Sequence, residues 1–181
     1  MKTEIRFAGL GGQGLVSASI LMAEGCGVVG DYQVVQTQFY GVSITGGASC
    51  GDVVVSDVPI ALPWVLNPDL MVVMAQEAVK AHAALMNPGT TVLADDLYVT
   101  DTGPFAEGVK VLRLPLTRTA DEVGLRKCAN MVALGATARM TGLLGLEDLL
   151  QAVAARAPGK PEINAQAVKA GYNLPDDQAL S

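Results

Sequence analysis

Residues 5–14 read Ile5-Arg6-Phe7-Ala8-Gly9-Leu10-Gly11-Gly12-Gln13-Gly14, an apolar run that passes directly into a glycine-rich segment. The segment from Gln13 to Val28 contains no proline, so we predict a strand, a glycine turn and a helix in this order. Gly27 and Gly30 mark the end of the helix, because glycine tolerates the left-handed backbone that closes a helix. Residues 33–38 read as a second strand, and the chain therefore opens with a predicted βαβ unit.

The rest of the chain alternates between apolar runs and helical patterns. Further strands are predicted at 52–56, 69–74, 91–94 and 109–114, and further helices at 76–86, 129–141, 146–155 and 161–171. The run 69–74 is typical of a strand buried on both faces of a parallel sheet. The pattern predicts a single α/β domain, a three-layer α/β/α Rossmann-like fold with a mainly parallel sheet and a helical C-terminal third. Residues 1–114 form its sheet, residues 115–172 its C-terminal helices and residues 173–181 a tail.

Composition narrows the class of protein. Of the 181 residues, 50% are hydrophobic and 17% are charged, which supports a full core and excludes a disordered chain. The apolar runs are too short for a membrane-spanning helix, and no export signal precedes the first strand, so we expect a cytoplasmic protein without a membrane partner. Cys26, Cys50 and Cys128 are far apart and lack CxxC spacing, which predicts small buried hydrophobic side chains rather than disulfides or a metal site.

The charge distribution restricts the ligands. A net charge of −6 argues against the basic surface that nucleic-acid binding requires. No Lys or Arg occurs from Phe7 to Val79, whereas six acidic residues do. We therefore expect backbone N–H groups to hold any anion that binds to this half of the chain.

The glycine turn between strand and helix matches GxGxxG, the context of dinucleotide binding, and the N-terminus of the helix offers N–H donors there. A complete fingerprint also needs an acidic residue at the end of the second strand. That strand ends in Thr37-Gln38-Phe39, and the nearest acid, Asp31, precedes it. A dinucleotide site and a purely structural turn both stay open.

The other residues that could take part in binding or catalysis occur singly in the sequence, without an obvious functional partner. The loop from Tyr40 to Ser49 suits hydrogen bonds to a ligand or a partner, and is otherwise an irregular connection. Asn130 is predicted to cap its helix or to take a core position, or else to point into a site, while His82, the single histidine, lacks a catalytic companion. Asp95-Asp96 suggests a solvated turn or a metal site, and Trp64 a surface anchor. No group of these candidate residues supplies a nucleophile together with a base, so the chain is predicted to be catalytically incomplete.

Several stretches together resemble the gamma subunit, or the equivalent fused domain, of 2-oxoacid:ferredoxin oxidoreductases, which act on pyruvate, 2-oxoglutarate or 2-ketoisovalerate. They are residues 5–14, 37–41, 46–49, 56–60, 68–69, 130–136 and 162–172. The resemblance implies a subunit of a cytoplasmic hetero-oligomeric enzyme that oxidatively decarboxylates a 2-oxoacid to an acyl-CoA and reduces ferredoxin. It also implies alpha and beta subunits, and a delta subunit, as partners. These carry the thiamine diphosphate and the iron–sulfur clusters, and the isolated chain is inactive.

The same resemblance implies that the gamma subunit contributes to assembly and to the binding of coenzyme A. The residues expected at that site are Gly11, Gly12, Gln13, Gly14, Tyr40, Gly46 and Gly47. Many relatives carry an arginine immediately before the paired glycines, where this chain has Thr45. Threonine supplies no charge for a phosphate.

Two alternatives remain at this point. A structural subunit without a ligand would have its glycine turn packed shut against its own side chains. A stand-alone dinucleotide-binding oxidoreductase would bind NAD(P) or FAD by itself.

Overall fold

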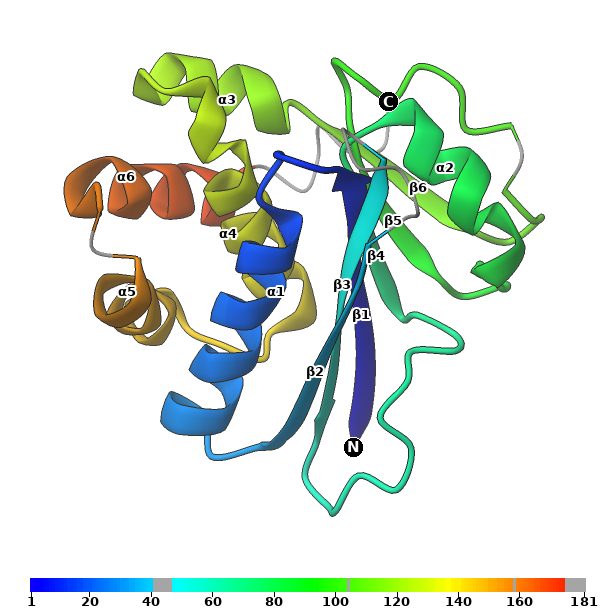
Figure 1. The fold of residues 1–181 in the computed structure, drawn as a ribbon, viewed down its shortest axis with the longest axis horizontal. Helices are drawn as coiled ribbons and strands as arrows, with labels where there is room; N and C mark the ends of the chain where they lie inside the picture. The colour runs from blue at the N-terminus through cyan, green and yellow to red at the C-terminus, as the bar shows by residue number, and fades with distance from the viewer. Residues whose placement is uncertain (41–46, 104, 158, 175–181) are drawn as a thin grey trace.

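The computed structural model describes residues 1–40, 47–103, 105–157 and 159–174 (Figure 1). Thr45, Gly46 and residues 175–181 of the predicted tail lie outside the described residues. The strands are β1 (Lys2–Leu10), β2 (Gln33–Tyr40), β3 (Ala48–Ser56), β4 (Leu70–Val73), β5 (Thr91–Asp95) and β6 (Lys110–Leu114). The helices are α1 (Leu15–Glu24), α2 (Gln76–His82), α3 (Leu116–Val123), α4 (Ala129–Thr141), α5 (Leu146–Arg156) and α6 (Pro161–Tyr172). Shorter turns are the π-helical η1 (Gly25–Val29) and the 3-10 turns η2 (Ala83–Leu85) and η3 (Arg126–Cys128).

The strands form one sheet in the order β2-β3-β1-β4-β5-β6. Strands β1, β4, β5 and β6 pair in parallel, and β3 is antiparallel to both of its neighbours. The predicted mainly parallel α/β sheet is therefore confirmed. The opening βαβ unit differs from the prediction, because β3 lies between β1 and β2. The short connection from Tyr40 to Ala48 suits an antiparallel hairpin, whereas adjacent parallel strands need a longer crossover.

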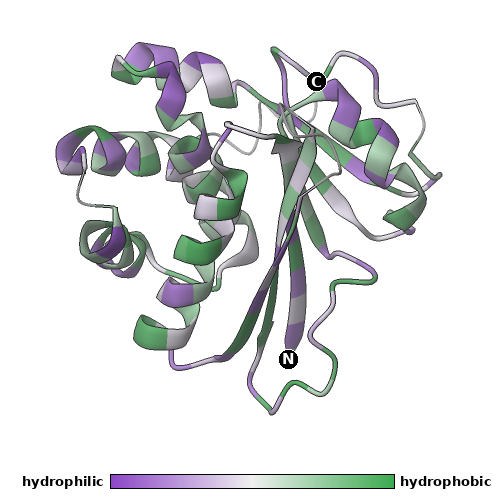
Figure 2. Cartoon of the chain, viewed as in Figure 1, coloured by the Kyte–Doolittle hydropathy of each residue, from purple (hydrophilic) through white to green (hydrophobic). Residues whose placement is uncertain are grey.

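The sheet separates two helical layers (Figure 1). Helices α1, α3, α4, α5 and α6 lie on one side, and α2 lies on the other. The larger hydrophobic core lies between the sheet and the layer of five helices. It includes Phe7, Leu15 and Leu134, all at most 1% exposed. A smaller core includes Val79 of α2 and Val73 of β4. Figure 2 shows hydrophobic residues along the central strands and hydrophilic residues on the outer helices, as expected for three layers around a buried sheet.

The helices after the sheet include one that was not predicted, α3. Helix α4 has the predicted bounds, while α5 and α6 each extend one residue beyond theirs. Close packing of α4 on α6 requires Gly171, where an added Cβ would lie 1.9 Å from the Val132 carbonyl oxygen. No helix among the described residues has the length and apolarity needed to cross a membrane.

Candidate functional site

The glycine turn lies at the carboxyl end of β1 and leads into α1. This edge of the sheet is also where β4 and β5 end, and ligands of α/β proteins bind at such an edge. Gly12 and Gly14 have φ angles of +93° and +75°, a left-handed backbone that favours glycine. An added Cβ at Gly12 would meet no atom within 4 Å, while one at Gly14 would lie 2.7 Å from Asn130 Nδ2. The turn is therefore open at Gly12 and closed at Gly14.

The side chain of Gln13 holds the turn in place. Its Oε1 accepts a hydrogen bond from the Leu10 backbone N–H at 2.7 Å, and its Nε2 donates to the Met74 carbonyl oxygen at 2.7 Å. Both ends of the amide are thus used within the protein. Gln13 fixes the turn to the end of β4.

Two further contacts join distant segments to the turn. Asn130 is buried and its Nδ2 donates to the Gly14 carbonyl oxygen at 3.1 Å. Asn130 makes no capping bond in its own helix, so the capping alternative is wrong, while its burial agrees with the core position that the sequence also suggested. The Gly11 N–H donates to the Gly47 carbonyl oxygen at 3.0 Å, which brings two of the predicted site residues together. Tyr40, another of them, ends β2 with a side chain 61% exposed.

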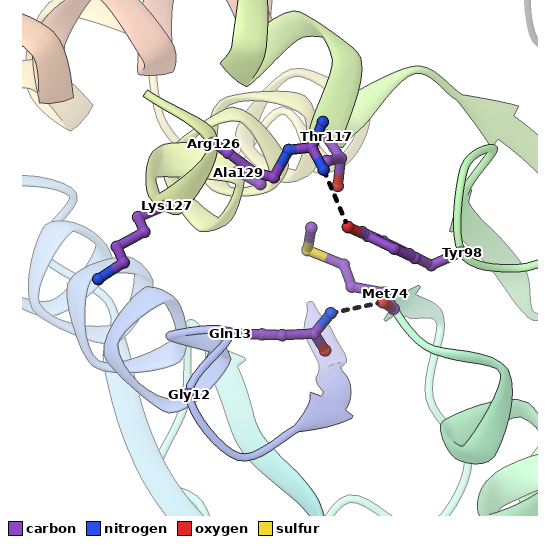
Figure 3. A pocket seen from close by; sticks show the side chains of 8 residues that line it. All are labelled: Gly12, Gln13, Met74, Tyr98, Thr117, Arg126, Lys127 and Ala129. Carbon is purple, nitrogen blue, oxygen red and sulfur yellow. Dashed lines mark hydrogen bonds between the residues drawn. The ribbon is translucent and has the colours of Figure 1, made fainter. Parts of the chain in front are cut away.

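A pocket of about 190 Å³ opens beside this turn (Figure 3). Its walls come from the turn, from the segments after β4 and β5, and from the start of the helical third. The lining residues are Gly12, Gln13, Met74, Tyr98, Thr117, Arg126, Lys127 and Ala129. Of the predicted site residues, Gly12 and Gln13 thus line the pocket directly.

Sequence reasoning missed the two cations of this pocket, Arg126 and Lys127. The glycine turn lies in the first half of the chain, which has no Lys or Arg from residue 7 to 79. Residues of η3 are distant from the glycine turn in the sequence and lie beside it only in the folded chain. The available signal was a pair of adjacent basic residues directly before the α4 helix in an otherwise acidic protein.

Arg126 is held on one side by an acidic partner. Its Nε donates to both carboxylate oxygens of Asp121, at 2.9 and 3.1 Å, and Nη2 donates to Oδ2 at 2.5 Å. Its Nη1 lies 3.5 Å from the Tyr98 hydroxyl across the pocket. The hydrogen bonds from Arg126 lower the pKa of Asp121 and those to Asp121 raise the pKa of Arg126, so both groups are charged at neutral pH.

Asp95 has a structural role at the same edge. It is fully buried and accepts hydrogen bonds from the Thr117 backbone N–H at 2.9 Å and from the Thr117 hydroxyl at 2.8 Å. Burial raises the pKa of Asp95, and the Thr117 bonds oppose this shift. The carboxylate therefore fixes the first turn of α3, and the prediction of a solvated turn was wrong for Asp95. Within the described ranges, no cluster of three His, Cys, Asp or Glu residues could hold a metal ion.

The remaining candidates lie elsewhere. His82 and Trp64 line a second pocket, of about 470 Å³, together with the Arg6–Asp52 ion pair. Burial and the nearby Arg6 charge lower the pKa of His82. Trp64 is 58% exposed, which confirms its predicted place at the surface, and the three cysteines are buried, as predicted.

The fold is a three-layer α/β domain with a pocket at the carboxyl ends of its parallel strands. The model of the pyruvate ferredoxin/flavodoxin oxidoreductase family matches residues 4–174. The chain belongs to this family, as a gamma subunit of a 2-oxoacid:ferredoxin oxidoreductase. The resemblance noted from the sequence is thereby confirmed.

Individual relatives support this assignment. The chain is 37% identical to the 2-oxoglutarate synthase subunit KorC of Methanocaldococcus jannaschii, over 96% of its own length and 94% of the relative. The gamma subunit of keto/oxoacid ferredoxin oxidoreductase from Geobacter sulfurreducens has the same fold, with a TM-score of 0.84 at 34% identity and 96% coverage of both chains. The 2-oxoglutarate:ferredoxin oxidoreductase of Magnetococcus marinus contains this fold within a longer chain. The TM-score is 0.85 at 24% identity, with 94% of this chain and 30% of that chain covered.

Proposed function

We propose that this gamma subunit binds coenzyme A at the glycine turn of residues 11–14 and presents it to partner subunits. In this proposal alpha and beta subunits, and a delta subunit, hold the thiamine diphosphate and the iron–sulfur clusters and pass electrons to ferredoxin. The structure of the Magnetococcus marinus relative contains 2-oxoglutarate, coenzyme A and succinyl-CoA. The observation that carries the proposal is that Gly12, with free space around its Cα, lines the pocket at the carboxyl ends of β1 and β4.

The geometry of the turn suits an anionic ligand. Helix α1 has no side-chain cap and no acidic residue in its first turn, so its first N–H groups face the carboxyl edge of the sheet without a competing carboxylate from the helix. The Gly47 carbonyl oxygen accepts a hydrogen bond from the Gly11 N–H, so the proposal includes Gly47 beside the turn, together with Tyr40. Gly46 lies outside the described residues. Gln13 and Gly14 shape the turn, and Gly11 and Gly12 form its exposed surface.

The alternative of a stand-alone dinucleotide oxidoreductase fits the topology less well. In the Rossmann arrangement the second strand lies beside the first and places an acid near the ribose. Here β3 occupies that place, and β2 ends in Gln38-Phe39-Tyr40. The alternative of a subunit without any ligand predicts a turn packed shut, whereas Gly12 has open space beside it.

Calorimetric titration of the assembled oxidoreductase with coenzyme A tests the proposal. Gly12→Val should abolish measurable binding, because the side chain enters the pocket. Gly89→Val is a matched control, since Gly89 has a similar φ of +101° and open space around it, but precedes β5 at the opposite edge of the sheet. Unchanged affinity in a folded Gly12→Val complex would contradict the proposal.

A further inference from the structure

We infer that Arg126 and Lys127 of η3 bind a phosphate group of coenzyme A and supply the positive charge that Thr45 does not. The inference rests on the proposed function and names the charged groups of the same site. Both residues line the pocket beside the glycine turn.

Both cations line the pocket together with the turn. In Figure 3 the Arg126 guanidinium reaches toward Tyr98, whereas the exposed Lys127 side chain lies at the left of the view with its ammonium directed away from the other lining residues. In this inference a phosphate at the pocket accepts hydrogen bonds from the Arg126 guanidinium, and from the Lys127 ammonium after this exposed side chain turns toward it. Bonds from such charged donors to phosphate are stronger than those between neutral groups.

Arg126 keeps donors for a ligand although it is paired. Asp121 takes bonds from Nε and Nη2, and Nη1 points across the pocket to the Tyr98 hydroxyl at a long 3.5 Å. The bidentate contact fixes the plane of the guanidinium, and the outer edge stays available. An exposed ion pair of this kind adds little to the stability of the fold. Its main effect is to hold the guanidinium in an orientation that keeps N–H donors available to a ligand.

Lys127 supplies the uncompensated positive charge of the pocket, since Asp121 balances the charge of Arg126. In the described part of the chain, no carboxylate lies within ion-pair distance of Lys127. The chain has no cation from residue 7 to 79, and its net charge is −6. Among the residues that line this pocket the cations are Arg126 and Lys127, so η3 is the source of counter-charge that we infer for a phosphate at the glycine turn.

Titration of the assembled complex with three probes tests the inference: coenzyme A, 3′-dephospho-coenzyme A and pantetheine, which has no phosphate. Lys127→Ala should raise the Kd for coenzyme A about tenfold, and the Arg126→Ala/Lys127→Ala double variant about a hundredfold. Pantetheine binding should be equal in all proteins. The control is Lys110→Ala, an exposed lysine at the start of β6, at the other edge of the sheet.

Each outcome separates the inference from the proposed function. If Gly12→Val weakens coenzyme A binding while the η3 variants bind like the unmodified complex, the inference is wrong and the proposed function stands. If Gly12→Val binds normally, the proposed function fails. If the η3 effect disappears with 3′-dephospho-coenzyme A, the bound group is the 3′-phosphate. If the effect persists, the bound group is the pyrophosphate, and both results support the inference.

Discussion

The Asn130 side chain donates a hydrogen bond to the Gly14 carbonyl oxygen at 3.1 Å, across 116 residues of sequence. It joins the start of α4 to the start of α1. Gly14 must be glycine for two reasons, since its φ is +75° and an added Cβ would lie 2.7 Å from Asn130 Nδ2. The shape of the glycine turn thus depends on a residue in the helical third of the chain.

This contact predicts non-additive effects of two substitutions. Gly14→Ala should destabilise the protein by about 2–3 kcal/mol, from the left-handed backbone and the clash with Asn130. In an Asn130→Ala background the clash is absent, and Gly14→Ala should cost about 1 kcal/mol less. Urea unfolding of the four proteins in the cycle measures the difference. Additivity within about 0.5 kcal/mol would show that the two residues are not coupled.

Gln13→Glu should destabilise the protein by about 2 kcal/mol at pH 7, because a carboxylate cannot donate to the Met74 carbonyl oxygen. The fold should raise the pKa of the new carboxyl group, so the loss relative to the unmodified protein should shrink as the pH falls and the acid becomes protonated. Unfolding free energies at pH 5 and pH 7 measure this. Gln76→Glu is the control, since Gln76 also bonds backbone groups but at an exposed helix start.

Much of the fold follows from local patterns. The apolar run of β4 and the glycine turn have strong local signals, and both were predicted. The place of β3 was not, because strand order depends on which edges pair in space. Helix α3 also escaped prediction, and its first turn is held by Asp95, a contact 22 residues away that no local pattern encodes.

The site was predictable only in part. The glycines were visible because their spacing between a strand and a helix has a local meaning. Arg126 and Lys127 were not, since they reach the turn through the packing of α4 on α1. Gln13 was expected to contribute to binding, and this stays a prediction; its bond to Met74, which holds the turn beside the end of β4, could not be foreseen from local sequence.

The buried Arg6–Asp52 pair predicts a large effect of single substitutions. The two residues face each other on β1 and β3, joined by two hydrogen bonds of 2.7 and 2.6 Å, and Arg6 also donates to the Val65 carbonyl oxygen. Asp52→Ala leaves a buried guanidinium without a counter-charge and should cost about 3–5 kcal/mol. The Arg6→Met/Asp52→Leu double variant should be more stable than Asp52→Ala in denaturant unfolding. A double variant less stable than the single one would refute this explanation.

Cys26 predicts a loss of stability at alkaline pH. It is 0% exposed in η1, and burial raises the pKa of its thiol to about 12. A thiol in an unfolded chain has a pKa near 8.5, so the unfolded state ionises first as the pH rises. The stabilising contribution of this site is complete below about pH 8.5 and is lost progressively towards pH 12.

Between pH 8 and pH 10.5 this site should therefore remove about 2–3 kcal/mol from the free energy of unfolding. In Cys26→Ala the decrease over the same interval should be smaller by that amount, while the other cysteines and the tyrosines contribute equally to both proteins. Urea unfolding at the two pH values measures the difference. Equal decreases in both proteins would show that the Cys26 thiol ionises as readily in the folded chain as in the unfolded one.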